Sequence, residues 1–234
     1  MRRITAFAAL IGVLSAAGTA LAAGDGILIV HAITSGNETL THRARIERTR
    51  VRSEVVGPGA NEAVVFDRTA QVMRVIDYQT RTYSEISVAD SDRVGGHMAG
   101  AGLTDPPLEY TRGGADKAGQ WACDKYVVAR KGQKIGEVCI AEPAALGFTP
   151  KDLEIVKPFV EFYSKVTKGG AALLFNVGLT GPPDSAGIAV SLIGAAGGGA
   201  PSKTMLTGAT RETFPDSLFA VPAGFAKRAF PGMR

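Results

Sequence analysis

The segment 63–88 places the strongest constraint on the fold, because its sequence has the pattern of three short strands in a meander. Its runs of Val, Ile, Met and Tyr suit a pleated surface that is half buried. The connections 67–70 and 77–80 both begin with Asp, a residue that forms turns by accepting hydrogen bonds from the backbone after it. We therefore expect an antiparallel sheet around this segment.

Further segments extend the expected sheet. Residues 26–34 are apolar on both faces, which indicates a buried strand. Residues 187–193 and 203–212 predict a final hairpin. The segment 214–225 alternates turn residues with apolar residues, and we expect it to form a tail strapped across the edge of the sheet.

A basic stretch follows the first strand. Residues 39–56 have the pattern of one strand, with a one-residue bulge between Glu47 and Arg48 that returns the polar side chains to a single face. That face would suit an anionic headgroup or a phosphate, or would simply be the solvated side of a sheet. No aromatic residues are interleaved for stacking on bases. The candidate anion contacts are Arg43, Arg45, Arg48, Arg50 and Arg52.

Residues 149–168 predict one long helix. Thr149 is a suitable N-cap, Pro150 suits the first helical position, and the glycines at 169–170 end the helix. Pro158 is expected to bend it by removing a backbone hydrogen bond. The apolar side chains share one wide face. The residues of this face that would line an apolar groove are Leu153, Val156, Phe159, Val160, Phe162 and Tyr163.

The segment 89–120 is rich in Gly and poor in large apolar residues, so we expect a flexible flap there. A weak helix around residues 91–98 and an edge strand at 108–111 would be its ordered parts.

The N-terminal residues predict export. A short basic region precedes an apolar run over residues 4–15, and Ala-Leu-Ala at 20–22 has the form of a cleavage site. These features indicate a signal peptide over residues 1–22, with a single domain over 23–230. The apolar run is too short for a comfortable membrane span, and no later stretch reaches about 18 apolar residues. We therefore expect a periplasmic protein that is soluble after cleavage and has no transmembrane segment.

Export permits a disulfide between Cys123 and Cys139. The two flanking strands form a hairpin around the turn 130–133. A fold about the middle of this turn pairs Val127 with Ile135 and places the cysteines directly opposite each other, within reach of a disulfide. Two buried free thiols are the alternative. A catalytic redox pair would more usually show a C-x-x-C spacing.

The sequence offers little support for catalysis or for nucleic-acid binding. His31, His42 and His97 lack the spacing of metal ligands, and no G-x-S-x-G, H-E-x-x-H or P-loop motif occurs. We expect no metal, no cofactor and no enzymatic activity, with His31 a satisfied core residue. A cluster of His42 or His97 with carboxylates would instead favour an enzyme. Without the signal peptide the chain has 24 basic and 22 acidic residues (26 − 2 and 22 − 0), a net charge of +2 that argues against nucleic acid.

Several segments in order resemble an uncharacterised family of exported bacterial proteins with a LolA-like fold. They include residues 75–85, the run Ala118–Tyr126, the Leu-Gly pair at 146–147, and the C-terminal run P-x-S-L-F-x-V-P-A-G-aromatic at 215–225. The resemblance covers nearly all of the chain after the signal peptide. It implies an α+β fold with a curved antiparallel sheet, a partial β-barrel, whose concave face is covered by one long helix and a flexible flap.

Two functional hypotheses follow from this resemblance and from the apolar helix face. The first is a periplasmic, non-enzymatic binding protein that carries or senses a lipid, an acyl chain or a lipidated envelope protein in an apolar groove. The alternative is a structural or signalling interaction module of the cell envelope, with a filled core and no ligand. The sequence specifies neither the ligand nor the oligomeric state.

Overall fold

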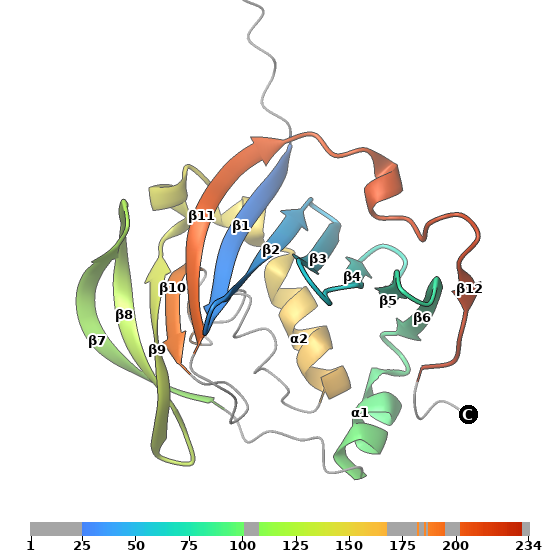
Figure 1. The fold of residues 1–234 in the computed structure, drawn as a ribbon, viewed down its shortest axis with the longest axis horizontal. Helices are drawn as coiled ribbons and strands as arrows, with labels where there is room; N and C mark the ends of the chain where they lie inside the picture. Colours follow the sequence, from blue (N-terminus) through green and yellow to red (C-terminus); the bar gives the residue numbers. More distant parts are fainter. Residues whose placement is uncertain are drawn as a thin grey trace, which may run out of the picture.

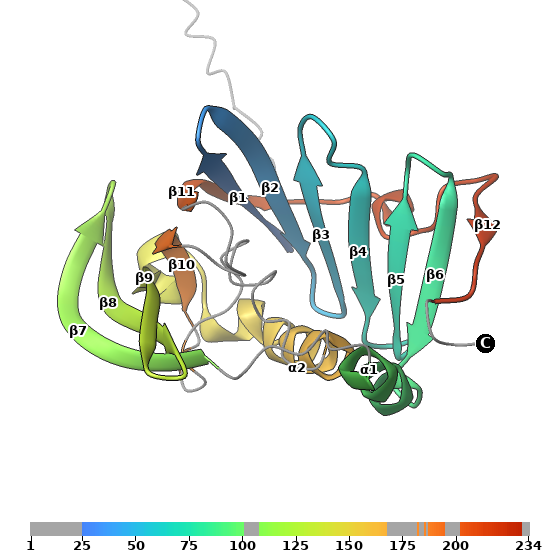
Figure 2. The ribbon, with the colours of Figure 1, turned by 60° about the horizontal axis from the view of Figure 1, so that its bottom comes forward.

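The computed structural model describes residues 25–100, 108–167, 182, 185, 187–194 and 202–230. Within them the chain forms one strongly curved sheet, with the helices α1 and α2 on its concave side (Figures 1 and 2). The predicted signal peptide lies outside these residues. The elements are β1 (Gly26–Ser35), β2 (Glu38–Ile46), β3 (Arg50–Val56), β4 (Glu62–Asp67), β5 (Val72–Asp77), β6 (Thr82–Ser87), α1 (Ser91–Gly100), β7 (Leu108–Ala118), β8 (Trp121–Arg130), β9 (Gln133–Ala141), α2 (Val156–Thr167), β10 (Ile188–Gly194), β11 (Ser202–Glu212) and β12 (Ala226–Lys227), with short 3₁₀ turns at Pro143–Leu146, Pro150–Leu153 and Asp216–Leu218.

The sheet has twelve strands in the order β12-β6-β5-β4-β3-β2-β1-β11-β10-β9-β8-β7. All neighbouring pairs are antiparallel except β12 with β6. The end strands β12 and β7 each have one partner, so the curved sheet does not close into a barrel. This agrees with the expected partial barrel. None of the helices in the described ranges is long and apolar enough to cross a membrane.

The predicted meander is confirmed as β4, β5 and β6 (Figure 2). Its turns form for the expected reason. The Asp67 carboxylate accepts hydrogen bonds from the backbone N–H groups of Thr69 and Ala70, each at 2.9 Å, and Asp77 accepts one from the N–H of Thr80 at 2.9 Å. The final hairpin is also confirmed, as β10 paired with β11.

The basic stretch is not one strand, so the predicted bulge is wrong. The chain reverses at residues 47–49, and β2 pairs with β3 so that Ile46 lies opposite Val51. The Glu47 N–H donates to the carbonyl of Arg50 at 2.8 Å, which closes the turn. The polar side chains change parity between Glu47 and Arg48 because the chain turns there. After the reversal, the polar side chains of β2 and β3 still lie on the same face of the sheet.

The expected long helix is divided. A 3₁₀ turn over Pro150–Leu153 precedes α2, which begins at Val156. The Asp152 carboxylate accepts hydrogen bonds from the Thr149 N–H at 2.7 Å and its hydroxyl at 2.8 Å, so the expected N-terminal signal caps the 3₁₀ turn. Pro158 falls in the first turn of α2, where a helix N–H needs no intrahelical partner. The prediction that Pro158 removes a mid-helix bond is therefore wrong.

The prediction of a flap over 89–120 is wrong for most of its length. Residues 91–100 form α1, which packs against α2, and Val94 is buried. Residues 108–118 form β7, an edge strand much longer than expected, because it pairs along its whole length with β8. Residues 101–107 lie outside the described part, as does the side chain of His97.

The two faces of the sheet are covered by different segments. On the concave face, Phe66 and Met73 belong to one apolar cluster with α2 residues such as Phe159. On the convex face, Val65 and Ile76 form a second cluster with Phe214 and Phe219 of the C-terminal segment. Alternation of side chains along each strand produces this division. The C-terminal segment crosses the convex face and ends as β12 beside β6, close to the expected strap (Figure 1).

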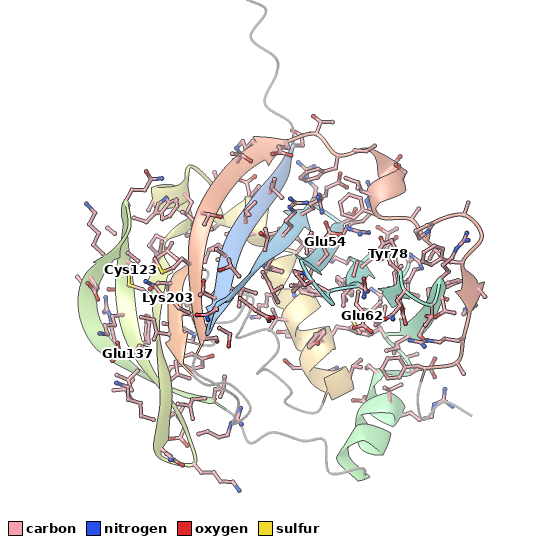
Figure 3. The ribbon with its side chains drawn as sticks, in the orientation of Figure 1. Glu54, Glu62, Tyr78, Cys123, Glu137 and Lys203 are labelled. Carbon is pink, nitrogen blue, oxygen red and sulfur yellow. A yellow bond between two sulfur atoms is a disulfide. The ribbon has the colours of Figure 1, made fainter. Side chains whose placement is uncertain are left out.

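The predicted disulfide between Cys123 and Cys139 is present, with 5.5 Å between the Cα atoms (Figure 3). The expected register is wrong by two residues, since Lys125 rather than Cys123 lies opposite Cys139. The difference arises because the turn is the tighter pair Lys131–Gly132, followed by an irregularity at Val128/Ala129 in the pairing. An offset of two keeps both cysteines on the same face of the sheet, so the bond forms diagonally.

We predict that loss of this disulfide lowers the free energy of unfolding by about 3 kcal/mol, because the bond restricts a loop of the unfolded chain. Chemical denaturation with and without reductant measures the loss. The variant Cys123→Ala/Cys139→Ala should be as stable as the reduced protein and insensitive to reductant. Equal midpoints for the oxidised and fully reduced wild-type protein would contradict the prediction.

Candidate functional site

The candidate site lies on the concave face where the sheet bends between β1, β11 and β10. The pairing of β1 with β11 shifts between Val30 and His31, which leaves Thr207 as an extra residue whose hydroxyl donates to the carbonyl of Val30 at 3.1 Å. The pairing of β10 with β9 shifts between Ala189 and Ser191. Bulges bend strands and redirect side chains, and they are frequent beside functional sites.

His31 and His42 lie together at this bend. The turn at Gly36–Asn37 pairs Ser35 with Glu38, and the same register places His31 directly opposite His42. The two imidazole rings stack with centroids 5.8 Å apart and an angle of 22° between their planes. Both side chains are completely buried, at 0% exposure. Sequence reasoning missed this pair, although counting outward from a turn at Gly36–Asn37 would have found it.

Each histidine uses one ring nitrogen in a described hydrogen bond. Nε2 of His31 bonds the carbonyl of Ala189 at 2.8 Å, reaching across β11 to β10. Nε2 of His42 lies 2.9 Å from the hydroxyl oxygen of Ser53 on β3. The Nδ1 atoms of both rings are buried without a hydrogen-bond partner among the described residues. A buried polar atom without a partner costs about 1–3 kcal/mol, so two adjacent ones need an explanation.

Burial holds both rings in the neutral form. Burial lowers the pKa of His31 from 6.5 to about 4, and the hydrogen bond to Ala189 opposes this effect. Burial also lowers the pKa of His42 well below 6.5, and repulsion from His31 lowers it further. The pair therefore carries no charge at neutral pH. It offers hydrogen-bonding nitrogens inside an apolar cluster.

The predicted groove residues, five on α2 and Leu153 in the 3₁₀ turn before it, belong to one apolar cluster next to the sheet. The Phe66 ring on β4 has its centroid 5.9 Å from that of Phe159 and 5.6 Å from that of Phe162, and the Phe159 ring lies 6.1 Å from Tyr163. These contacts join the helix wall directly to the sheet. Phe159, Phe162, Tyr163 and Leu153 are buried, while Val156 and Val160 are half-buried.

The basic residues lie on the opposite, convex face, and several of them bind carboxylates of the protein. Glu54 forms ion pairs with both Arg45 and Arg52, two arginines that lie opposite each other on β2 and β3. Burial raises the pKa of Glu54, but hydrogen bonds from the two arginines outweigh it and leave that pKa below its ordinary value. Arg52 is only 5% exposed and also donates to the Tyr78 hydroxyl at 2.7 Å (Figure 3).

The C-terminal segment completes this network. Arg52 donates to the carbonyl of Leu218 at 2.9 Å. Arg50 bonds Asp216 at 2.7 Å and stacks on the ring of Phe219, 4.4 Å from its centroid. These two arginines therefore hold the C-terminal segment against the sheet.

The remaining candidate anion contacts have different surroundings. Arg45 supports Arg52 through their shared partner Glu54. Arg43 is half-buried on β2, and Arg48 is exposed in the 47–49 turn. Anion binding by this surface stays a prediction.

No group of three or more His, Cys, Asp or Glu side chains in the described ranges is arranged to hold a metal ion. The hydrogen bonds described for His42 and His31 go to Ser53 and Ala189, and neither goes to a carboxylate. The pair of His31 and His42 therefore offers uncharged hydrogen-bonding nitrogens in an apolar setting.

No family model and no curated protein matches the chain. Among solved structures, an uncharacterised conserved protein from Thermus thermophilus is similar, with a TM-score of 0.50 and 10% identity over 88% of this chain and 91% of that one. This likeness shows the fold alone.

Two weaker likenesses accompany it. MucB in complex with MucA(peri) has a TM-score of 0.38 and 10% identity, over 85% of this chain and 54% of that one. A LolA superfamily protein from Nitrosomonas europaea has a TM-score of 0.30 and 6% identity, over 83% of this chain and 89% of that one. The LolA-like family of the chain stays a prediction.

We predict that Arg52→Met lowers the free energy of unfolding by about 2–4 kcal/mol, because it leaves Glu54 with one partner and removes the bond to Leu218. Arg48→Met is the matched control and should change stability by less than about 0.5 kcal/mol, since Arg48 is exposed in a turn. Urea denaturation of both variants measures this difference. Equal stability of the two variants would refute the structural role of Arg52.

We predict that acidification destabilises the protein through the histidine pair. A histidine with a pKa lowered by folding binds protons more readily when unfolded, so its contribution to stability is present above pH 6.5 and is lost as the pH falls toward 4. For His31 alone the loss reaches about 1 kcal/mol by pH 5.5, and His42 adds to it.

The measurement is the free energy of unfolding from pH 7 to 5.5. This window lies above the range in which carboxylates with lowered pKa values, such as Asp152 at about 2, become protonated. The variant His42→Phe should show about half the proton uptake on unfolding. Stability of the wild-type protein that is flat across this window would contradict the prediction.

Proposed function

We propose that this protein is an exported, non-enzymatic binding protein of the bacterial periplasm that holds an acyl chain or a lipidated partner between its concave face and α2. The observation that supports the proposal is the continuous apolar cluster that joins β1–β6 to the helix. The disulfide suits an oxidising compartment, and the predicted signal peptide would deliver the protein there.

The contacts between α2 and the sheet are of a kind that a ligand could replace. Its apolar face meets the sheet through side-chain contacts such as Phe66 with Phe162, whereas a polar anchor, the ion pair of Asp152 with Arg211, lies before the helix begins. An acyl chain gains about 0.8 kcal/mol for each methylene that it buries. A chain of about ten methylenes would therefore compete with contacts of this kind.

The interaction module without a ligand is the second candidate, and one observation favours it. Phe159 is 0% exposed, and its ring packs against both Phe66 and Tyr163, so this end of the concave face is already filled by the protein itself. In that case α2 is part of a permanent core, and the protein would act through its surface.

Native mass spectrometry and lipid extraction of protein purified from an envelope fraction distinguish the two candidates. A carrier should retain an adduct of lipid mass that delipidation removes. Val156→Glu, which places a charge on the half-buried helix wall, should reduce occupancy about tenfold. Lys157→Glu is the matched control, because Lys157 is exposed, and it should retain the adduct.

An apo mass alone, both from the envelope fraction and after incubation with acyl lipids, would overturn the carrier function. The interaction module would then be tested by pull-down with the intact protein.

A further inference from the structure

We infer that His31 and His42 form a polar subsite within the concave face that binds the un-ionised carboxyl group of a fatty acid. The inference rests on the proposed acyl-chain function and specifies its ligand. It starts from the Nδ1 atoms of the two stacked rings, which are buried and have no hydrogen-bond partner among the described residues.

The tautomer of His31 is determined by its backbone partner. The carbonyl of Ala189 can only accept, so the Nε2 atom of His31, 2.8 Å away, must carry the hydrogen. In the neutral ring the Nδ1 atom then has a lone pair and no hydrogen. A ligand that satisfies His31 must therefore donate a hydrogen bond.

His42 can supply the complementary group. When the Ser53 hydroxyl donates to Nε2 of His42, across their 2.9 Å separation, the hydrogen of the neutral ring resides on Nδ1. The pair then presents one acceptor on His31 and one donor on His42. An un-ionised carboxyl group has one O–H donor and one carbonyl acceptor, so it matches both nitrogens, whereas an ester lacks the donor.

The surroundings disfavour a charged ligand. The strand register places apolar residues around the pair on this face, including Ile29 on β1, Ala44 on β2 and Leu206 on β11. Charged side chains that the same register assigns to this face lie elsewhere along the strands. On β1 to β6, β10 and β11 they are Glu38, beside the turn; Glu62 and Asp77, on β4 and β5; and Arg211, opposite Ile27, which pairs with Asp152.

The apolar cluster that contains Ile29 and Ala44 continues to Phe159 and Phe162 of α2. A fatty acid with its carboxyl group at the histidines would thus have its chain along an apolar wall. Because a carboxylic acid is ionised in water at pH 7, binding in the un-ionised form takes up one proton from solution. The proton from solution forms the O–H bond of the carboxyl group, which donates to Nδ1 of His31, and no other covalent bond changes.

The test compares palmitic acid with methyl palmitate, using displacement of a fluorescent apolar probe from the full protein at pH 7. Once the ionisation of the free acid at pH 7 is corrected for, wild-type protein should bind the un-ionised acid about tenfold or more tightly than the ester. Calorimetry in two buffers of different ionisation enthalpy should show uptake of about one proton with the acid and none with the ester.

The variant His31→Phe, which removes the acceptor that only the acid can use, should bind the acid only as well as the ester. If it does not fold, Ser53→Ala, which removes the group that sets the tautomer of His42, should weaken the binding of both compounds, because both present a carbonyl oxygen to Nδ1 of His42. Equal binding of acid and ester by wild-type protein, or acid binding without proton uptake, would overturn the subsite while leaving the acyl-chain function intact. Failure of both compounds to bind would overturn the acyl-chain function and the subsite with it.

Discussion

Burial of both faces of the sheet is the constraint on which the rest of this structure depends. Along β3 and β4 successive side chains alternate, so that Phe66 points toward α2 while Val65 and Arg52 point toward the C-terminal segment. Each covering segment therefore needs its own apolar residues, and both have them. In the described part of the chain, the helices α1 and α2 cover the concave face, and the C-terminal segment covers the convex face.

The two faces have opposite polar character. On the convex face a charged network around Glu54 and Arg52 is satisfied by partners within the protein, including the Leu218 carbonyl. At the bend of the concave face, the buried polar groups include the neutral rings of His31 and His42, each with one nitrogen lacking a described partner. Polar groups that are fully satisfied hold a structure together, whereas unsatisfied ones in an apolar setting favour a binding role.

Sequence reasoning succeeded where the signal is local. The turns that begin at Asp67 and Asp77 depend on hydrogen bonds within four residues, and they form as expected. It failed where two structures share one local pattern. A shift in side-chain alternation between Glu47 and Arg48 suits a bulge or a tight turn, and only the pairing of β2 with β3 decides between them. Residues 108–118 form a strand because their backbone pairs with the edge of β8.

The sequence by itself determined the strands of the meander, the wide apolar face of α2, and the disulfide. The disulfide was predicted correctly in spite of the wrong register, because an error of two residues leaves both cysteines on the same face of the sheet. Only the tertiary structure decided the candidate site. His31 reaches Ala189 across 158 residues of chain, and Arg52 reaches Leu218 across 166. Such contacts depend on the curvature of the whole sheet and on the paths of the segments that cover it, which no local pattern of residues specifies.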